Sequence, residues 1–195
     1  MLRKEILISG FGGQGVVRAG QILGYSSILA GLRASMLVSH GTETRGGYVR
    51  SQVILADEPV DNPAVERADI FCALSQAAYD RFLPLAAWGL TLYDPYFVAP
   101  AAPLPSAHLA LAARGLALEK SGRELAANMI FLGAALRGLA LIPLSCALQA
   151  AREIMPRHAE SNTLALEAGY RHCTGEEAGP LGGNGVFLQP NPKKG

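Results

Sequence analysis

The chain of 195 residues carries 17 Lys and Arg against 16 Asp and Glu, so its formal net charge is only +1. Hydrophobic residues make up 50% of the sequence and charged residues 17%, below the roughly 25% charged residues of an average soluble protein. The length suits one domain with a sizeable core, and the balanced charge disfavours a nucleic-acid partner. We expect part of the apolar excess to face another subunit.

Neither secretion nor membrane insertion is predicted. The first apolar run is interrupted by charges at residues 3–5, unlike a signal peptide. The longest apolar stretch, residues 125–142, contains Asn128 and Arg137, which favours a buried helix over a membrane span. The three cysteines are widely separated, so no disulfide framework or metal site is indicated. We expect a cytoplasmic protein with reduced thiols.

Short apolar runs alternate with helical patterns at the start of the chain. Residues 5–9 form an apolar run that ends in glycines, and residues 14–30 carry apolar residues at helical spacing, with Gly31 as a stop. Residues 34–39 are again short and apolar. The three segments predict a βαβ unit.

Further elements follow in the middle of the chain. Three more strands are predicted at residues 48–56, 69–75 and 90–93. Residues 76–87 are predicted to be helical, with a bend at Pro84. Residues 94–105 contain four prolines, which predicts an extended connection.

The second half of the chain predicts helices. Residues 123–141 are apolar on nearly every face, which indicates a helix buried on most sides. Ser145 is the predicted N-cap of a helix that ends at Met155, and residues 160–172 predict another helix. We therefore predict a three-layer α/β/α domain with a mostly parallel, Rossmann-like sheet over residues 1–174, followed by a Gly/Pro-rich tail at residues 175–195.

A glycine loop, Gly10–Gly15, fits G-x-G-x-x-G between a strand and a helix, where backbone N–H groups can approach an anion. A nicotinamide enzyme needs a carboxylate at the end of the second strand, but no carboxylate appears before Glu43. This disfavours a self-contained NAD(P)-binding reductase, although Arg33 or Arg45 leaves an NADP variant open. The glycines could instead serve close strand-to-helix packing, which would leave Gly13 and Gln14 without a role.

A second loop, Gly41–Gly47, combines Glu43 and Arg45 with three glycines at the end of a predicted strand. A solvated surface turn with a Glu–Arg pair could have the same composition. We expect the two loops to end adjacent strands and to converge on one crevice.

Two isolated polar residues have simpler explanations. Asn128 places an amide on an apolar helix face, where capping a neighbouring backbone is favoured over ligand contact. His40 is expected to be structural or exposed rather than an acid or base. The sequence contains no G-K-S/T phosphate loop, G-x-S-x-G, H-E-x-x-H or C-x-x-C. Redox chemistry by this chain alone is therefore not expected.

The motifs together resemble the gamma subunit of 2-oxoacid:ferredoxin oxidoreductases across residues 4–172. They are Gly10-Phe-Gly-Gly-Gln-Gly15, Glu43-Thr-Arg-Gly-Gly47, Ala68-Asp69 and Ala127-Asn-Met129-x-x-x-Gly133. The family usually has Ser-Tyr-Gly-Pro-Glu where this chain has Ser39-His-Gly-Thr-Glu43. His40 and Thr42 therefore put in doubt an aromatic contact and a rigid turn at those positions.

The resemblance implies a complex that oxidatively decarboxylates a 2-oxoacid with coenzyme A, and yields acyl-coenzyme A, carbon dioxide and reduced ferredoxin. It implies thiamine diphosphate, Mg²⁺ and 4Fe–4S clusters in alpha, beta and ferredoxin-like delta partners, and no cofactor bound by this chain alone. We lean toward 2-oxoglutarate or a branched-chain oxoacid as substrate. A purely structural scaffold subunit remains the alternative.

We predict no catalytic and no metal-binding residue. The residues predicted for a shared cofactor site or subunit interface are Gly12, Gly13, Gln14, Gly15, Glu43, Arg45, Gly46, Gly47 and Asn128.

Overall fold

A six-stranded sheet in the order β2-β3-β1-β4-β5-β6 forms the centre of the chain, which the computed structural model describes at residues 1–41, 47–101 and 106–172. The strands are β1 (Arg3–Phe11), β2 (Arg33–His40), β3 (Tyr48–Ala56), β4 (Ile70–Ala73), β5 (Leu90–Tyr93) and β6 (Ala107–Ala110). Parallel pairing runs from β1 through β4 and β5 to β6, whereas β3 is antiparallel to both β1 and β2. The predicted mostly parallel sheet is confirmed.

The position of β3 corrects the predicted arrangement of the first strands. β1 and β2 run parallel and are joined by helix α1 (Val16–Leu29), but β3 lies between them. The expectation that the two loops follow adjacent strands was wrong. The ends of β1 and β2 and the start of β3 nevertheless lie at one edge, because Phe11 pairs with Tyr48 and His40 pairs with Val49. The apolar pattern of residues 48–56 indicated a strand but carried no information on its direction.

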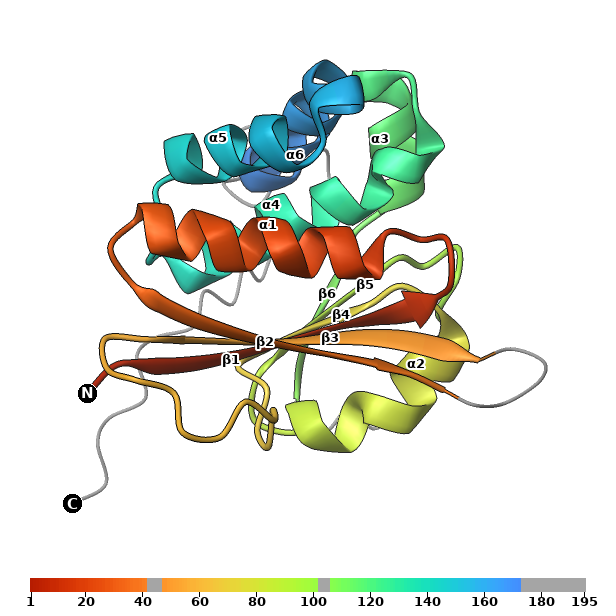
Figure 1. Cartoon of the computed structure of the whole chain (residues 1–195). Coiled ribbons are helices and arrows are strands. Elements are labelled where there is room, and N and C mark those ends of the chain that lie inside the picture. Colours follow the sequence, from red (N-terminus) through yellow and green to blue (C-terminus); the bar gives the residue numbers. More distant parts are fainter. Residues whose placement is uncertain (42–46, 102–105, 173–195) are drawn as a thin grey trace.

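Helices cover the two faces of the sheet unequally (Figure 1). The other helices are α2 (Gln76–Phe82), α3 (Ala113–Ser121), α4 (Ala127–Leu139), α5 (Leu144–Ile154) and α6 (Ala159–His172), with 3₁₀ turns η1 (Leu83–Ala86), η2 (Glu124–Ala126) and η3 (Pro156–His158). Figure 1 shows α2 alone below the sheet and the remaining helices above it. In that upper layer, α5 packs on α1, and α6 packs on α4. Helices on both faces confirm the α/β/α class.

The hydrophobic core has one part on each face of the sheet. Ile6 and Ile8 of β1 belong to the larger cluster, under the upper helices, and Leu7 belongs to the smaller cluster against α2. Successive side chains of a strand point to opposite faces, so a strand covered on both faces needs an unbroken apolar run. This explains the composition of β1.

Helix α4 is buried on nearly every side, as predicted. It packs against β4 and β5 and also against α3 and α6. A Cβ atom on Gly133 would collide with the carbonyl oxygen of Leu166, and one on Gly169 would collide with that of Ile130. The backbones of α4 and α6 are therefore in direct contact, which only glycine permits at both positions.

Several predicted boundaries were right and others were wrong. Helix α2 gives way to the 3₁₀ turn η1 at Leu83, which confirms the bend expected at Pro84. Helix α5 begins at Leu144 directly after Pro143, so Ser145 lies within the first turn and is not the N-cap. Strand β6 and helix α3 were not predicted.

Other predictions lie outside the described residues. The division into a domain at residues 1–174 and a tail at residues 175–195 stays a prediction, because the description stops at residue 172. Of the helices in the described part of the chain, none is both long and apolar enough to cross a membrane.

Candidate functional site

The glycine loop connects the end of β1 to the start of α1. Gly13 has φ of 89° and Gly15 has φ of 74°, in the left-handed region that favours glycine. Gly15 is the N-cap of α1 and offers no side chain to the helix, and the first turn of α1 contains no acidic residue. The free N–H groups and positive dipole end of α1 are therefore available to an acceptor from outside the helix.

Gln14 holds the glycine loop against the next strand of the sheet. Its Oε1 accepts a hydrogen bond from the N–H of Phe11 at 2.6 Å, and its Nε2 donates one to the carbonyl of Leu74, just after β4, at 2.9 Å. Both ends of the amide are thus used within the chain. The sequence left this residue without a role, and the structure gives it the role of fixing the loop.

Asn128 fixes the other end of the loop. Its Nδ2 donates a hydrogen bond to the carbonyl oxygen of Gly15 at 3.2 Å, and the residue is 5% exposed. The interpretation that Asn128 caps a neighbouring backbone is confirmed. Since Asn128 lies in the first turn of α4, the N-terminal ends of α1 and α4 come together here.

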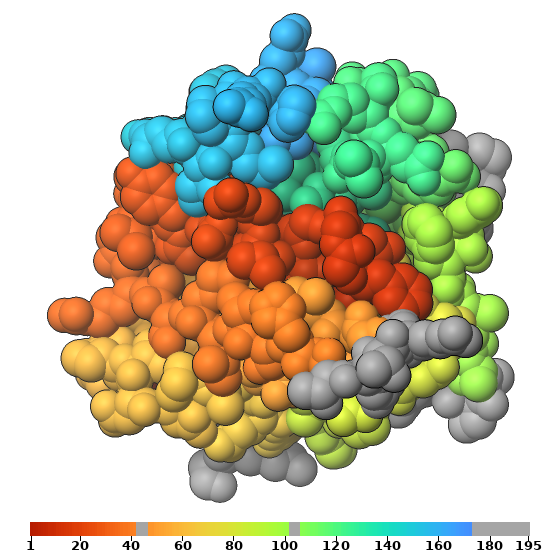
Figure 2. All heavy atoms as spheres, turned by 45° about the vertical axis from the view of Figure 1, so that its right-hand side comes forward, coloured from red at the N-terminus to blue at the C-terminus, as the bar shows by residue number. Residues whose placement is uncertain are grey.

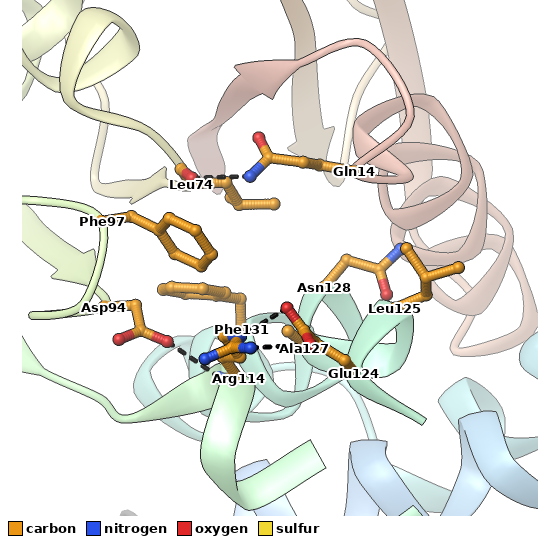
Figure 3. Close-up of a pocket in the computed structure, with 10 residues that line it drawn as sticks. All are labelled: Gln14, Leu74, Asp94, Phe97, Arg114, Glu124, Leu125, Ala127, Asn128 and Phe131. Atoms are coloured by element: carbon orange, nitrogen blue, oxygen red, sulfur yellow. Dashed lines mark hydrogen bonds and ion pairs between the residues drawn. The ribbon is translucent and has the colours of Figure 1, made fainter. Parts of the chain in front are cut away.

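A pocket lies at the edge where β1, β4 and β5 reach their C-terminal ends, which we call the carboxyl edge. Each of these strands is followed closely by one lining residue, namely Gln14, Leu74 and Asp94. The full lining is Gln14, Leu74, Asp94, Phe97, Arg114, Glu124, Leu125, Ala127, Asn128 and Phe131 (Figure 3). The pocket has a volume of about 80 Å³ and is partly open to solvent. Open α/β sheets commonly bind ligands at this edge.

The charged groups of the pocket are paired with one another or with the backbone. The carboxylate of Asp94, which is 2% exposed, accepts hydrogen bonds from the N–H groups of Tyr96 at 2.9 Å and Arg114 at 2.8 Å. The guanidinium of Arg114 donates two hydrogen bonds to the carboxylate of Glu124. This pairing raises the pKa of Arg114 and lowers the pKa of Glu124 relative to their ordinary values. The hydrogen bond from the N–H of Arg114 to the Asp94 carboxylate joins the end of β5 to the start of α3.

The structure brings together only some of the predicted site residues. Gly12, Gly13, Gln14, Gly15 and Asn128 lie around one contact between α1 and α4. Gly47 directly precedes β3 and so lies at the same edge, because Tyr48 pairs with Phe11. Glu43, Arg45 and Gly46 lie outside the described residues. His40 is exposed at the end of β2, as expected.

The sequence interpretation missed most of the pocket. Asp94 had a usable signal, since it directly follows a predicted strand of a parallel sheet. Arg114 and Glu124 had none, because α3 and η2, which position them, were not predicted. Phe97 lies in the proline-rich connection after β5, and the sequence did not indicate the path of that connection.

Metal and thiol chemistry find little support in the described parts. Among residues 1–41, 47–101 and 106–172, no group of three His, Cys, Asp or Glu side chains could hold a metal ion. Cys72 is fully buried in β4, and this burial raises the pKa of its thiol to about 12. The thiol is therefore protonated and packs as a core side chain.

The arrangement of the first strands also bears on the nucleotide alternative. In a dinucleotide-binding crevice, the acid that holds the ribose follows the strand next to the glycine-loop strand. Here the strand that neighbours β1 on that side is β3, which enters the sheet at this edge rather than ending there. A self-contained NAD(P) site is not favoured.

The chain is similar to known proteins over most of its length. A model of the pyruvate ferredoxin/flavodoxin oxidoreductase family matches residues 5–172. The 2-oxoglutarate synthase subunit KorC of Methanothermobacter marburgensis is 35% identical over 189 residues, which covers 86% of this chain and 95% of the relative.

Solved structures share the fold. The gamma subunit of a keto/oxoacid ferredoxin oxidoreductase from Geobacter sulfurreducens has a TM-score of 0.76 at 31% identity, over 86% of this chain and 96% of that one. A 2-oxoglutarate:ferredoxin oxidoreductase from Magnetococcus marinus, solved with 2-oxoglutarate, coenzyme A and succinyl-CoA bound, has a TM-score of 0.76 at 20% identity. That match covers 88% of this chain but 31% of the other. The same fold therefore also occurs as one part of a longer chain.

Proposed function

The chain belongs to the pyruvate ferredoxin/flavodoxin oxidoreductase family, and we propose that it is the gamma subunit of a complex that oxidises 2-oxoglutarate. The observation that carries this proposal is the near end-to-end match to a 2-oxoglutarate synthase subunit, which covers 95% of that relative. The complex would decarboxylate the oxoacid, transfer the acyl group to coenzyme A and pass the electrons to ferredoxin. We place it in the cytoplasm, where thiols such as those of Cys72 and Cys146 stay reduced.

The partners that we propose are alpha and beta subunits, and a ferredoxin-like delta subunit where the complex has one. Thiamine diphosphate with Mg²⁺, and the 4Fe–4S clusters, are assigned to these partners. When bound there, thiamine diphosphate supplies the electron sink for decarboxylation. This chain contributes binding surface and positioning, and it is inactive alone.

The glycine loop is our candidate for the part of this chain that faces the shared site. The backbone N–H groups of Gly12, Gly13 and Gly15 and the first turn of α1 suit a phosphate group. Gln14 and Asn128 act as positioning residues that hold the loop in shape, as their hydrogen bonds to Leu74 and Gly15 support. A phosphate of coenzyme A or of thiamine diphosphate has the chemistry that this loop would accept.

We propose that the second loop, Gly41–Gly47, also faces the shared site. Gly47 leads into β3 at the carboxyl edge, and Glu43, Arg45 and Gly46 precede it in sequence. An arginine next to a phosphate-binding loop would add a bidentate donor for an anion.

The experiment is reconstitution with the cognate partner chains. We expect viologen reduction that depends on 2-oxoglutarate and coenzyme A from the complete complex, and background rates from the lone chain or from the partners without it. Pyruvate and 2-oxoisovalerate serve as competing substrates. Oxoacid-dependent reduction by the lone chain would overturn the subunit assignment.

A substitution separates a site role from a scaffold role. Arg45→Ala should abolish turnover while the complex still assembles. The matched control is Arg33→Ala, which removes an exposed arginine at the opposite end of β2. If the Arg45→Ala complex turns over at the wild-type rate, this loop is structural only.

A further inference from the structure

We infer that the pocket at the carboxyl edge receives an apolar side chain of the catalytic chain of the complex. The inference rests on the proposed function, because it needs a catalytic chain as partner. It concerns the face of the molecule that Figure 2 turns toward the viewer, where the red N-terminal segment meets green segments from the middle of the chain.

The polar groups of the pocket are hydrogen-bonded within the chain. Gln14 uses its amide on Phe11 and Leu74, and each carboxylate oxygen of Asp94 already accepts a backbone N–H. Arg114 and Glu124 neutralise each other through two hydrogen bonds. These contacts hold the polar side chains in place around the apolar part of the pocket.

The remaining surface of the pocket is apolar. The rings of Phe97 and Phe131 both line the pocket, and Figure 3 shows Gln14 and Asn128 on other sides of it. Phe131 is only 3% exposed, so it forms a fixed floor, whereas Phe97 is 37% exposed at the opening. A desolvated floor with an exposed aromatic rim is the arrangement that holds an apolar anchor residue in protein interfaces.

Large exposed apolar side chains gather at the opening. Tyr96 and Leu125 are each 68% exposed, and the rings of Tyr96 and Phe97 meet edge to face with centroids 4.9 Å apart. The guanidinium of Arg114 lies over the Tyr96 ring at 4.4 Å, which holds that ring in place. Tyrosine, phenylalanine and arginine are the residues enriched at the centres of protein interfaces.

The fold itself points to the catalytic chain as the occupant. The same fold makes up about a third of a longer oxidoreductase chain, and the proposed function assigns the catalytic parts to separate partner chains. The pocket is also continuous with the glycine loop through Gln14. A partner that completes a site at that loop would therefore cover the pocket as well. A second copy of this chain has no such relation to the loop.

Crosslinking within the intact complex tests the contact directly. A photoreactive amino acid at position 125 should crosslink to the catalytic chain. The same residue at position 28 is the control, because Ile28 is also exposed, at 56%, but lies near the C-terminal end of α1, away from the carboxyl edge. Crosslinks to a second copy of this chain, or none at position 125, would overturn the inference.

Affinity gives an independent measurement. Leu125→Asp and, separately, Tyr96→Ser should raise the dissociation constant of the complex by about 10- to 100-fold, as expected for central interface residues, whereas Ile28→Asp should change it less than about 3-fold. Circular dichroism and thermal melting confirm folding of each variant.

If the wild-type chain assembles and the Leu125→Asp and Tyr96→Ser variants assemble equally well, the inference fails but the proposed function stands. If the wild-type chain does not assemble with the catalytic chain, the proposed function fails first.

Discussion

The side chain of Asn128 lies 3.2 Å from the carbonyl oxygen of Gly15, and a Cβ atom on Gly15 would collide with the same amide nitrogen. The lack of a side chain at position 15 therefore does two things at once. It permits the left-handed φ of 74°, and it opens the space that the amide of α4 fills. Residues 113 positions apart in sequence are joined by this contact at the start of α1.

Substitutions on the two sides of this contact should not be additive. We expect Gly15→Ala to lower the free energy of unfolding by more than about 2 kcal/mol, from backbone strain plus the collision. Asn128→Ala should cost about 1 kcal/mol, because the Gly15 carbonyl keeps its helical hydrogen bond from Ala19. The double variant should lose less than the sum, since removing the amide relieves the collision. Urea unfolding of the four proteins gives the coupling, and strict additivity would contradict the geometry.

Gln14 offers a prediction that separates its two hydrogen bonds. Gln14→Ala removes both, whereas Gln14→Glu keeps an acceptor for the N–H of Phe11 and loses the donor to the carbonyl of Leu74. We expect the Phe11 amide to exchange rapidly with solvent in the first variant and to stay protected in the second. Hydrogen exchange followed by NMR measures this. Equal protection in the two variants would mean that the Gln14 side chain does not hold the loop.

The crossing of α4 and α6 predicts opposite effects for two chemically identical changes. Gly133→Ala should destabilise the protein by about 1 to 3 kcal/mol or more, because the new methyl meets backbone atoms of α6 that cannot move aside. Gly115→Ala, in α3, should stabilise it by roughly 0.5 to 1 kcal/mol, since open space surrounds that position and alanine favours a helix. Thermal unfolding of both variants tests the pair. A stable Gly133→Ala protein would show that the two helices can separate without cost.

The sequence predicted those parts of the fold that local patterns encode. The apolar run of β1, the glycine stop after α1 and the proline at the end of α2 each act within a few residues, so each could be recognised. The direction and position of β3 could not be predicted, because strand order depends on pairing between distant segments. Strand β6, which contains no β-branched residue, and helix α3, which lacks acidic residues in its first turn, gave no clear signal.

The candidate site, too, could be predicted from the sequence only in part. The glycine loop was visible because its residue types are unusual, and Asn128 was visible because it is a single amide on an apolar helix. Their contact was not visible, since nothing in the sequence relates positions 15 and 128. The pairing of Arg114 with Glu124 across the pocket was invisible for the same reason.

Glu5 predicts how stability depends on pH. Its carboxylate accepts hydrogen bonds from the N–H groups of Glu66 at 2.7 Å and Arg67 at 3.0 Å and from the side chain of Arg3 at 2.8 Å. Burial acts to raise the pKa of Glu5, but these hydrogen bonds outweigh it, so the pKa lies below its ordinary value of 4.5. The stabilisation is therefore fully present above the pKa of the unfolded chain, and it is lost as the pH falls through the lower pKa of the folded protein.

Glu5→Gln should consequently lower the free energy of unfolding by about 1 to 3 kcal/mol near neutral pH, because the charged hydrogen bonds from the N–H groups of Glu66 and Arg67 are lost. The difference in stability between the variant and the wild type should shrink as the pH falls below the ordinary value of 4.5. The wild-type carboxyl then becomes protonated and is neutral, as the glutamine side chain is. Glu58→Gln is the control, because Glu58 is exposed in the turn after β3. Urea unfolding over a pH series measures both variants. If the loss of stability in Glu5→Gln stays constant into the acid range, the charge of the Glu5 carboxylate does not stabilise its contacts with residues 66 and 67.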